Sequence, residues 1–322
     1  GPGRGKPTRV TPRRAILAAA IGAALATQRG ARAAEPDWPA AIAIATASPG
    51  GTYHAYGIGL ARVLTRELGI AVSIRESSGP AENLRMLDGG MAQIAFVTTG
   101  AALAARGSAA QALFAMYDTP FHFVLRRDSP IRSFAELTGR SVAVGPEGGT
   151  GATYEPRLLA ALGAEIRPVH GSWENLAIRF AAGEFDAIAV AAGVPFPAIA
   201  ALEARRAIRY LPLSRAQVTQ LRLVAPELGA ARIPAGTYPS LLAAYETVGL
   251  YNLAVAHRGM PPSLAFEIVR AVFENHAEMM EAHAAAAATV PANFIHNTVL
   301  PWHPGAMRYY GNRAVTGVLR GD

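Results

Sequence analysis

The stretch "SPGGTYHAYG", residues 48–57, places two glycines and a threonine between a strand-like run and a helix-like run. The chain repeats the arrangement in "PEGGTGATYE", residues 146–155. The apolar runs "AAIAIATA" and "SVAVGP" precede the two loops, and apolar residues at helical spacing follow each loop until Gly69 and Gly163. The repetition predicts two copies of one α/β unit.

Both copies continue with the same order of elements. The first has the strand-like "IAVSIRES", a turn and short helix in "SGPAENLRMLDGG", and the strand-like "MAQIAFVTTG". The second has "AEIRPVHG", "SWENLAIRFAAG" and "EFDAIAVAAG", and both carry Glu-Asn-Leu, at 82–84 and 174–176. Alternating helices and short apolar strands predict parallel sheets in two similar lobes. Because ligands bind beyond the carboxyl ends of such strands, both glycine loops are expected at one cleft between the lobes.

The glycine loops suit a small anion. Glycine lets a ligand approach the backbone, and the helix that follows exposes unpaired N–H groups at the positive end of its dipole. Thr52 and Thr150 could cap these helices or donate a hydroxyl to a ligand, and Tyr53 offers a ring face and a phenol. The alternative is a plain strand-to-helix turn, with glycine for geometry and threonine as the cap.

Other candidate side chains leave two interpretations open. Asn83 and Asn175 each follow a glutamate at the start of a helix, which suits capping as well as ligand contact. Thr98 and Thr99 lie at a strand end and are expected to donate hydroxyls to the cleft. Trp173 could stack on a ligand or close the hydrophobic core.

Composition and charge exclude several classes of protein. The 322 residues suffice for two domains, and the formal net charge is +7. Residues 1–33 hold seven of the 30 basic residues and no acid, so the remainder is balanced at 23 basic and 23 acidic residues, which argues against nucleic-acid binding. The chain has no cysteine, and Lys6 is its one lysine, which excludes thiolate, P-loop and Schiff-base chemistry from the folded part.

Residues 1–33 resemble an export signal. The basic "TRVTPRRA" is followed by the apolar "AILAAAIGAALA", residues 15–26, and by "ARA", residues 31–33, which predicts cleavage after Ala33. Arg13 and Arg14 resemble the pair of a twin-arginine signal. The alternative is an uncleaved membrane anchor, but about 12 apolar residues span a bilayer poorly. The sequence therefore predicts a periplasmic protein.

Catalytic and metal-binding patterns are not found in the sequence. It contains no G-x-S-x-G, H-E-x-x-H or complete G-x-G-x-x-G. His276 and His283 are two helical turns apart, too far to share a metal, and are expected on a solvated helix face. An enzyme on this scaffold would need an acid–base group in the cleft, for which Asp118, Glu147 and His170 are the candidates. We therefore predict no catalytic residue, metal or cofactor.

The sequence resembles the TAXI-type solute-binding proteins of tripartite ATP-independent periplasmic (TRAP) transporters from about Ala41 to Val315. The resemblance is carried by "IATASPGGTYHAYGIGLARVL", "SSGPAENLRMLDGGMAQIAFVTTG", "AELTGRSVAVGPEGGTGATYEPRLLAALG", "AAGEFDAIAVAAGVPFPAIAAL", "MPPSLAFEIVRAVFEN" and "PWHPGAMRYY". It implies a type II periplasmic-binding-protein fold with two similar lobes and a ligand cleft between them. Residues 34–123 and 254–322 would form lobe 1, residues 124–253 lobe 2, and residues 121–128 and 249–258 the crossing strands.

The resemblance also implies a function. Such a protein is an extracytoplasmic receptor that delivers a small carboxylate-bearing ligand, such as glutamate, glutamine or 2-oxoglutarate, to TRAP permease subunits in the membrane. We expect a monomer, a prediction that does not come from the resemblance. The implied ligand-binding residues are Ser48, Gly51, Thr52, Tyr53, Asn83, Thr98, Thr99, Gly149, Thr150, Thr153 and Trp173. The alternatives are an exported ligand sensor that signals to a membrane partner and, further from the pattern, a cleft enzyme.

This sequence departs from the family pattern at several positions. Gln93 replaces the usual acidic residue, and the segment "AVAAG", residues 189–193, carries no side-chain hydrogen-bond donor. The second lobe is therefore expected to offer mostly backbone groups. No single arginine is identified as a carboxylate partner, and Arg75, Arg85, Arg126 and Arg179 all remain candidates.

Overall fold

The predicted repeat is present in the computed structural model, which describes residues 3, 35 and 37–312. The predicted export signal, apart from residue 3, and residues 313–322 lie outside the described residues. The strands are β1 (Ala41–Ala45), β2 (Ala71–Arg75), β3 (Ile94–Thr98), β4 (Ala110–Arg126), β5 (Ser141–Gly145), β6 (Arg167–His170), β7 (Ala187–Ala191), β8 (Ile208–Tyr210), β9 (Gly229–Ile233) and β10 (Tyr245–His257). The helices are α1 (Thr52–Leu68), α2 (Pro80–Asp88), α3 (Thr99–Ala104), α4 (Thr150–Ala161), α5 (Trp173–Ala181), α6 (Pro197–Glu203), α7 (Arg215–Val224), α8 (Pro262–Glu274), α9 (His276–Ala282) and α10 (Pro304–Asn312), with 3-10 turns η1 (Phe134–Leu137), η2 (Ala284–Ala288) and η3 (Pro291–His296).

The strands form one mixed sheet in the order β2-β1-β3-β10-β4-β7-β5-β6, with β9 beside β10 and β8 beside β4. In the first copy, β1 pairs in parallel with β2 and β3, and in the second, β5 pairs in parallel with β6 and β7. We call the part of the sheet around β1 the first half and the part around β5 the second half. Each copy therefore places its first strand between the other two, which confirms the predicted repeat.

Two long antiparallel strands join the halves. β10 pairs with β3 in the first half, and β4 pairs with β10 and, from Phe121 to Leu125, with β7 in the second half. The predicted first crossing, residues 121–128, covers only the end of β4, which begins at Ala110. Most of β4 is buried on both faces, so its apolar run shows no alternation that would have marked it as a strand.

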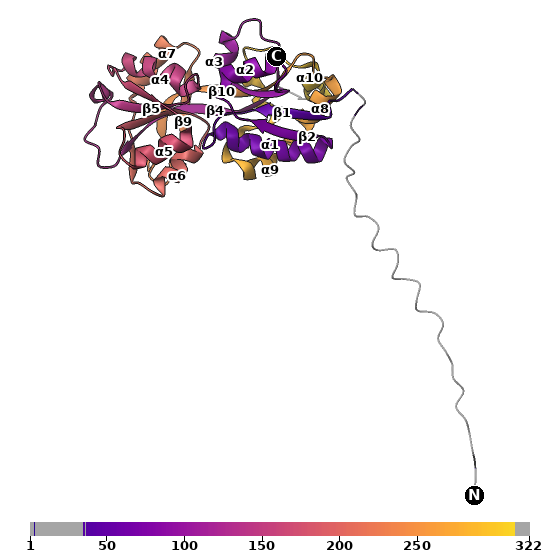
Figure 1. The fold of residues 1–322 in the computed structure, drawn as a ribbon, viewed down its shortest axis with the longest axis horizontal. Coiled ribbons are helices and arrows are strands. Elements are labelled where there is room, and N and C mark those ends of the chain that lie inside the picture. The colour runs from indigo at the N-terminus through magenta and orange to yellow at the C-terminus, as the bar shows by residue number, and fades with distance from the viewer. Residues whose placement is uncertain (1–2, 4–34, 36, 313–322) are drawn as a thin grey trace. The chain divides into compact units, whose positions relative to one another are not determined.

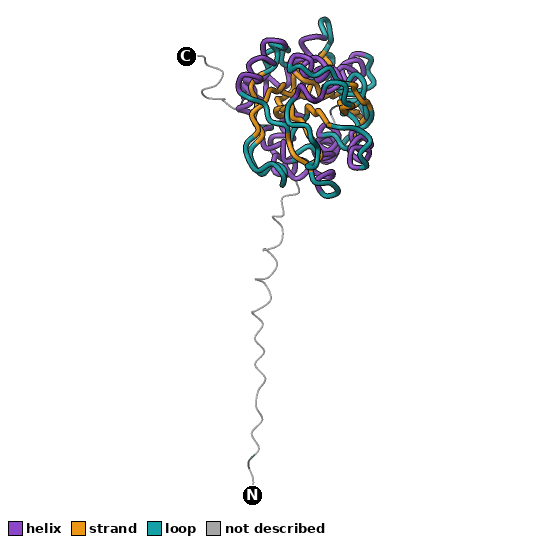
Figure 2. Tube along the Cα trace, turned by 90° about the vertical axis from the view of Figure 1, so that its left-hand side faces the viewer, coloured by secondary structure: helices purple, strands orange, loops and turns teal. Residues whose placement is uncertain are grey.

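Helices cover both faces of each half (Figure 1). In the first half, α2 and α3 lie on one face and α1 and α9 on the other, while in the second half α4 and α7 lie opposite α5 and α6. Figure 2 shows the strands inside a layer of helices and loops. The buried side chains form one hydrophobic cluster in the second half and two in the first, one on each face of its sheet.

The helix α1 illustrates how the sequence directs this packing. Tyr56, Leu60, Val63 and Leu64 recur at helical spacing and are fully buried, so this stripe holds α1 against the sheet. The helix ends at Gly69, whose φ of 67° is left-handed and whose N–H donates to Thr65 O. Among the described residues, no helix is long and apolar enough to cross a membrane.

Candidate functional site

A cavity of about 60 Å³ lies between the two halves. Strand ends, the loops that follow them and the first or N-cap residues of six helices line it, in keeping with ligand sites beyond the carboxyl ends of parallel strands. The first half contributes the starts of α1, α2 and α3, and the second half contributes the starts of α4, α5 and α6. The sequence thus brings both Gly-Gly-Thr loops to one site.

Three of the six helix starts, those of α3, α5 and α6, have a backbone N–H that is capped from within the fold. The hydroxyls of Thr98 and Ser172 cap α3 and α5. At α6, the N–H of Ala198 donates at 3.0 Å to the carbonyl of Gly50, which belongs to the other half.

The helices α1, α2 and α4 differ from these three, because their N-cap residues are Gly51, Gly79 and Gly149 and no side chain caps any of them among the described residues. At α2 the Glu82 carboxylate accepts from the N–H of Ser78, just before the helix, at 2.6 Å, so a negative charge already lies at that start. In the described structure, the starts of α1 and α4 have no such carboxylate. Both helices follow Gly-Gly-Thr loops, and both starts line the cavity. Their unpaired N–H groups and the positive ends of their dipoles are directed at the position where an anionic group would lie.

The first glycine loop also binds the second half directly. Pro49 O accepts from the N–H of Glu174 at 3.3 Å, and the hydroxyl of Thr52 donates to Gly193 O at 2.5 Å. Gly50 has a φ of 83°, and a Cβ at this position would lie 2.8 Å from the backbone nitrogen of Glu174. A side chain at residue 50 would therefore force the halves apart.

Hydroxyl and amide groups form the polar part of the cavity wall. Ser48 is 8% exposed, and its hydroxyl has no hydrogen-bond partner among the described residues. The phenol of Tyr53 donates to Asn252 Oδ1 at 2.6 Å, and the Asn252 amide in turn donates to Tyr117 O and to the hydroxyl of Thr119. Burial raises the pKa of Tyr53 well above its usual value, so this phenol stays neutral. Ser48 thus supplies the described cavity wall with a buried hydroxyl that the fold itself leaves unused.

Aromatic rings form the apolar wall on the side of the second half. Trp173 packs edge-to-face on Phe196 with ring centroids 5.3 Å apart. The N–H of Phe196 donates to the phenol oxygen of Tyr238, which contacts Nε2 of His122 at 3.1 Å. Because Nδ1 of His122 lies 3.1 Å from a carbonyl, Pro120 O, that nitrogen carries the proton and Nε2 accepts from Tyr238. Burial lowers the pKa of His122 to about 4, so the ring is neutral at pH 7.

None of the described residues that line the cavity is charged. The arginine candidates lie elsewhere: Arg126 donates to Phe185 O, Arg179 pairs with Glu184, and neither Arg75 nor Arg85 reaches the cavity wall. Asp118, Glu147 and His170, the possible acid–base groups, are absent from the wall as well. The arrangement can bind an anion through backbone dipoles and hydroxyls, and it places no charged acid–base pair beside the ligand position.

The structure brings eight of the eleven predicted ligand-binding residues to the cavity wall: Ser48, Gly51, Thr52, Tyr53, Thr98, Gly149, Thr150 and Trp173. The other three lie away from it. Asn83 is fully buried, and its amide holds the ends of β1 and β3 together through Thr46 O and Phe96 O. The Thr153 hydroxyl donates to Gly149 O, and Thr99, the first residue of α3, does not line the cavity.

Sequence reasoning missed several polar residues of the wall. Ser78 and Gly79 precede α2, and the analogy with the other loops before helices could have identified them. Thr119 and Asn252 lie on the crossing strands, far from either glycine loop in the sequence, and no local pattern marks them.

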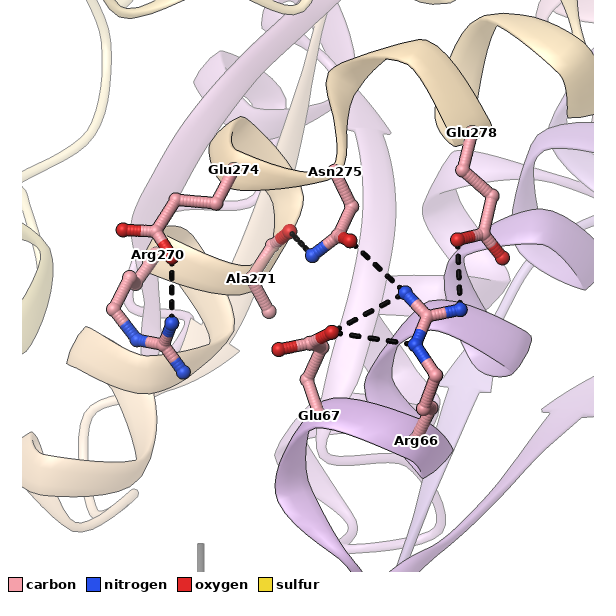
Figure 3. Close-up of polar contacts among 7 residues, drawn as sticks. All are labelled: Arg66, Glu67, Arg270, Ala271, Glu274, Asn275 and Glu278. Carbon is pink, nitrogen blue, oxygen red and sulfur yellow. Dashed lines mark hydrogen bonds and ion pairs between the residues drawn. The ribbon is translucent and has the colours of Figure 1, made fainter. Parts of the chain in front are cut away.

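His283 was expected on a solvated helix face, and this is wrong. The residue is 8% exposed, its Nε2 donates to Pro195 O of the second half at 2.7 Å, and its Nδ1 accepts from the N–H of Ala285. It follows α9, which Arg66 of α1 holds through Glu278 at 2.7 Å (Figure 3). The error arose because His283 lies just beyond the end of α9, where helical periodicity no longer applies.

A comparison with protein families gives one match that covers most of the chain. The model of the NMT1-like family matches residues 44–312. The chain belongs to the NMT1-like family. The matched residues contain both glycine loops and every described residue that lines the cavity.

Solved structures support the fold of this NMT1-like protein. The periplasmic binding protein BugD matches with a TM-score of 0.56 and 15% identity over 87% of this chain and 95% of its own. The protein XAC2383 from Xanthomonas citri, bound to ATP, matches with a TM-score of 0.50 and 17% identity over 85% of this chain and 99% of its own. The predicted fold class, an α/β periplasmic-binding-protein fold, is confirmed.

Proposed function

We propose that this protein is an extracytoplasmic solute-binding receptor that captures a small organic acid or amino acid and delivers it to a TRAP membrane permease. The observation that carries the proposal is the cavity between the two halves. Two uncapped helix starts that follow Gly-Gly-Thr loops, at α1 and α4, face the same space as the unpartnered hydroxyl of Ser48. Dipoles and hydroxyls of this kind bind a carboxylate without a charged side chain.

The position of the cavity supports a receptor that closes around its ligand. The halves meet through Pro49, Gly50 and Thr52 on the first-half side, next to the cavity. A ligand that touches both α1 and α4 would add further contacts across the same boundary. Binding would therefore favour the closed arrangement, because the ligand has greater affinity for it.

The TRAP assignment rests on the sequence motifs that resemble TAXI-type proteins, and periplasmic location rests on the signal-like residues 1–33. The family match and the binding-protein fold agree with a non-enzymatic receptor. Glutamate, glutamine and 2-oxoglutarate are the first ligands to test, since each carries a carboxylate on a small body.

Thermal unfolding tests ligand binding. The protein is unfolded, refolded to remove carried-over ligand and then heated with amino acids, dicarboxylates and oxo-acids. A ligand at 100 times its dissociation constant adds about 2.7 kcal/mol, which raises the melting temperature by several degrees or less. No shift with any acid would contradict the proposal.

The variant Ser48→Ala locates the binding. Because the fold does not use this hydroxyl, the melting temperature of the ligand-free variant should equal that of the parent protein. Affinity for the acid should fall about tenfold or more, because a hydrogen bond to a charged group is lost. Ser133→Ala, in an exposed loop before η1, is the control and should leave the affinity unchanged.

Delivery to a permease needs its own test. Vesicles that contain a TRAP permease should take up the labelled acid only when this protein and an ion gradient are both present. Binding without uptake by any such permease would favour the exported sensor.

A further inference from the structure

A second cavity, which we call the trough, adjoins the cavity between the halves and has a volume of about 370 Å³. Its walls are one face of α2, one face of α3 and the start of α4. The first-half walls thus belong to the helices that follow β2 and β3, and the second half supplies the opposite wall. The trough is therefore bounded by both halves, as the first cavity is.

The two cavities share part of their walls. Pro80, Thr98, Gly149 and Thr150 line both of them. These two threonines, the proline and the glycine thus lie at the boundary between the cavities, which we call the neck. A ligand that reaches from one cavity into the other would have to pass them, and an unbranched chain would do so with the least bulk.

The trough is mainly apolar between this neck and its outer end. Leu84 of α2 and the alanines Ala101 and Ala104 of α3 present methyl and methylene groups to it. Opposite them, the ring of Tyr154 lies against Gly100, and its phenol donates to Glu227 at 2.9 Å. The surface that an occupant would contact is hydrocarbon, which favours an apolar chain.

One cation lies in the trough wall. Arg85 is exposed on α2, and no ion pair within 4 Å joins it to a described residue. The pKa of Glu82, one turn earlier on α2, is lowered mainly by hydrogen bonds to its carboxylate and to a smaller extent by the charge of Arg85. Asp88, one turn further along α2, is engaged by the hydroxyl of Ser108 and the N–H of Ala109. The guanidinium of Arg85 is therefore the charged group available to an occupant, and it favours an anionic end.

We propose that the ligand is an α,ω-dicarboxylate longer than glutarate, which occupies both cavities. One carboxylate lies at the starts of α1 and α4, the methylene chain passes the neck into the trough, and the second carboxylate meets Arg85. This inference rests on the proposed function, because it extends the same binding site. It accounts for the disparity in size, since a cavity of about 60 Å³ holds a head group and the trough of about 370 Å³ holds the rest.

Calorimetric titration of the ligand-stripped protein with glutarate, adipate and suberate tests whether the methylene chain of the ligand enters the trough. Affinity should rise up to about fourfold for each methylene that enters the trough. The variant Ala104→Trp fills the trough from an exposed helix position and should abolish this rise while it leaves glutarate binding intact. Leu103→Trp, at the neighbouring exposed position that does not line the trough, should keep the rise.

The comparison of suberate with octanoate tests Arg85. The parent protein should prefer suberate, and Arg85→Gln should reduce that preference by up to about fivefold, as expected for an exposed ion pair. Arg62→Gln, on the exposed face of α1, should leave it unchanged.

The outcomes separate the two proposals. Glutarate binding with no rise in affinity for longer chains, or a rise that Ala104→Trp leaves intact, would overturn the trough as a ligand site while the receptor function stands. If affinity rises with chain length but is no higher for suberate than for octanoate, the role of Arg85 and the dicarboxylate class are overturned. If no acid of any length binds, the proposed function itself fails.

Discussion

The two glycine loops have matching sequences and different contacts. Gly50, Gly51 and Thr52 correspond to Gly148, Gly149 and Thr150, and both first glycines have a left-handed φ, 83° and 79°. The first loop gives two carbonyls and one hydroxyl to hydrogen bonds with the second half. No hydrogen bond joins the corresponding atoms of the second loop to the first half among the described residues, and Gly149 meets Ser78 only through close packing.

The difference shows how a duplicated motif can take two roles. The first loop is both a wall of the cavity and a clasp that holds the halves together. The second loop is a wall whose polar groups remain available. A carboxylate bound at both helix starts would therefore gain new interactions mainly at α4, because Thr52 already uses its hydroxyl in the fold.

A drop in pH should lower the free energy of unfolding, through residues that support the first loop, more than any single substitution in that loop. Tyr238 links His122 to Phe196, the N-cap residue of α6, and Gly50 O caps that helix from the first half. The pKa of His122 is about 4 in the fold and 6.5 as its ordinary value. The unfolded chain therefore takes up a proton that the folded protein excludes, and the free energy of unfolding falls as the pH drops from 6.5 to 4.

The difference between the two pKa values corresponds to about 3 kcal/mol. Urea unfolding between pH 7 and pH 4 should show this loss in the parent protein and a smaller loss in His122→Gln, which keeps an acceptor for Tyr238 but does not titrate. Carboxylates titrate in the same range, so the quantity of interest is the difference between the two proteins in free energy of unfolding against pH. If both proteins lost the same free energy between pH 7 and pH 4, the buried neutral histidine would be contradicted.

Gly50→Ala should have the next largest effect. The left-handed backbone costs roughly 1–2 kcal/mol for alanine, and its Cβ would meet the Glu174 backbone. Gly148→Ala is the matched control, because its φ is similar and its nearest neighbour, Ser78 Oγ, lies 3.6 Å away. Both variants should lose stability in urea, but only Gly50→Ala should also weaken ligand binding, by about tenfold or more. Equal affinities in the two variants would show that the first loop is not a clasp.

Substitutions of Thr52 and Thr150 separate most directly the two roles of the loops, contact between the halves and ligand binding. Thr52→Val leaves Gly193 O without its buried hydroxyl donor and should lower the free energy of unfolding by about 1–2 kcal/mol. Thr150→Val removes a hydroxyl that has no partner in the described structure, so stability should change by less than about 0.5 kcal/mol. Its effect should instead appear as weaker ligand binding in calorimetry. If Thr150→Val were the less stable variant, the contact between the halves would belong to the second loop and not to the first.

The sequence predicts the symmetric part of this site and not the asymmetric part. Both loops and their helices follow from local patterns of glycine, threonine and apolar spacing, and eight wall residues are among those that the family resemblance implies. The caps across the boundary do not, because Pro49 and Gly50 act through backbone carbonyls on partners far away in the sequence. Asn83 and Asn175 show the same limit. Both begin helices after a glutamate, yet Asn83 is fully buried between strands while Asn175 is exposed.

The smallest effect is expected from a contact that supports the clasp from a distance. Arg66 joins the end of α1 to Glu278 of α9 (Figure 3). The helix α9 leads to His283, which donates to Pro195 O beside the cavity. The Arg66 side chain is 49% exposed, so Arg66→Gln should lower the free energy of unfolding by only about 0.5 kcal/mol. The loss should shrink in high salt, because solvent ions screen such pairs. Ligand affinity should stay within about twofold of the parent protein, because burial and the hydrogen bond to Ala285 still fix the ring of His283. A large loss of affinity in Arg66→Gln would mean that the halves are held together through α9 rather than through the first glycine loop.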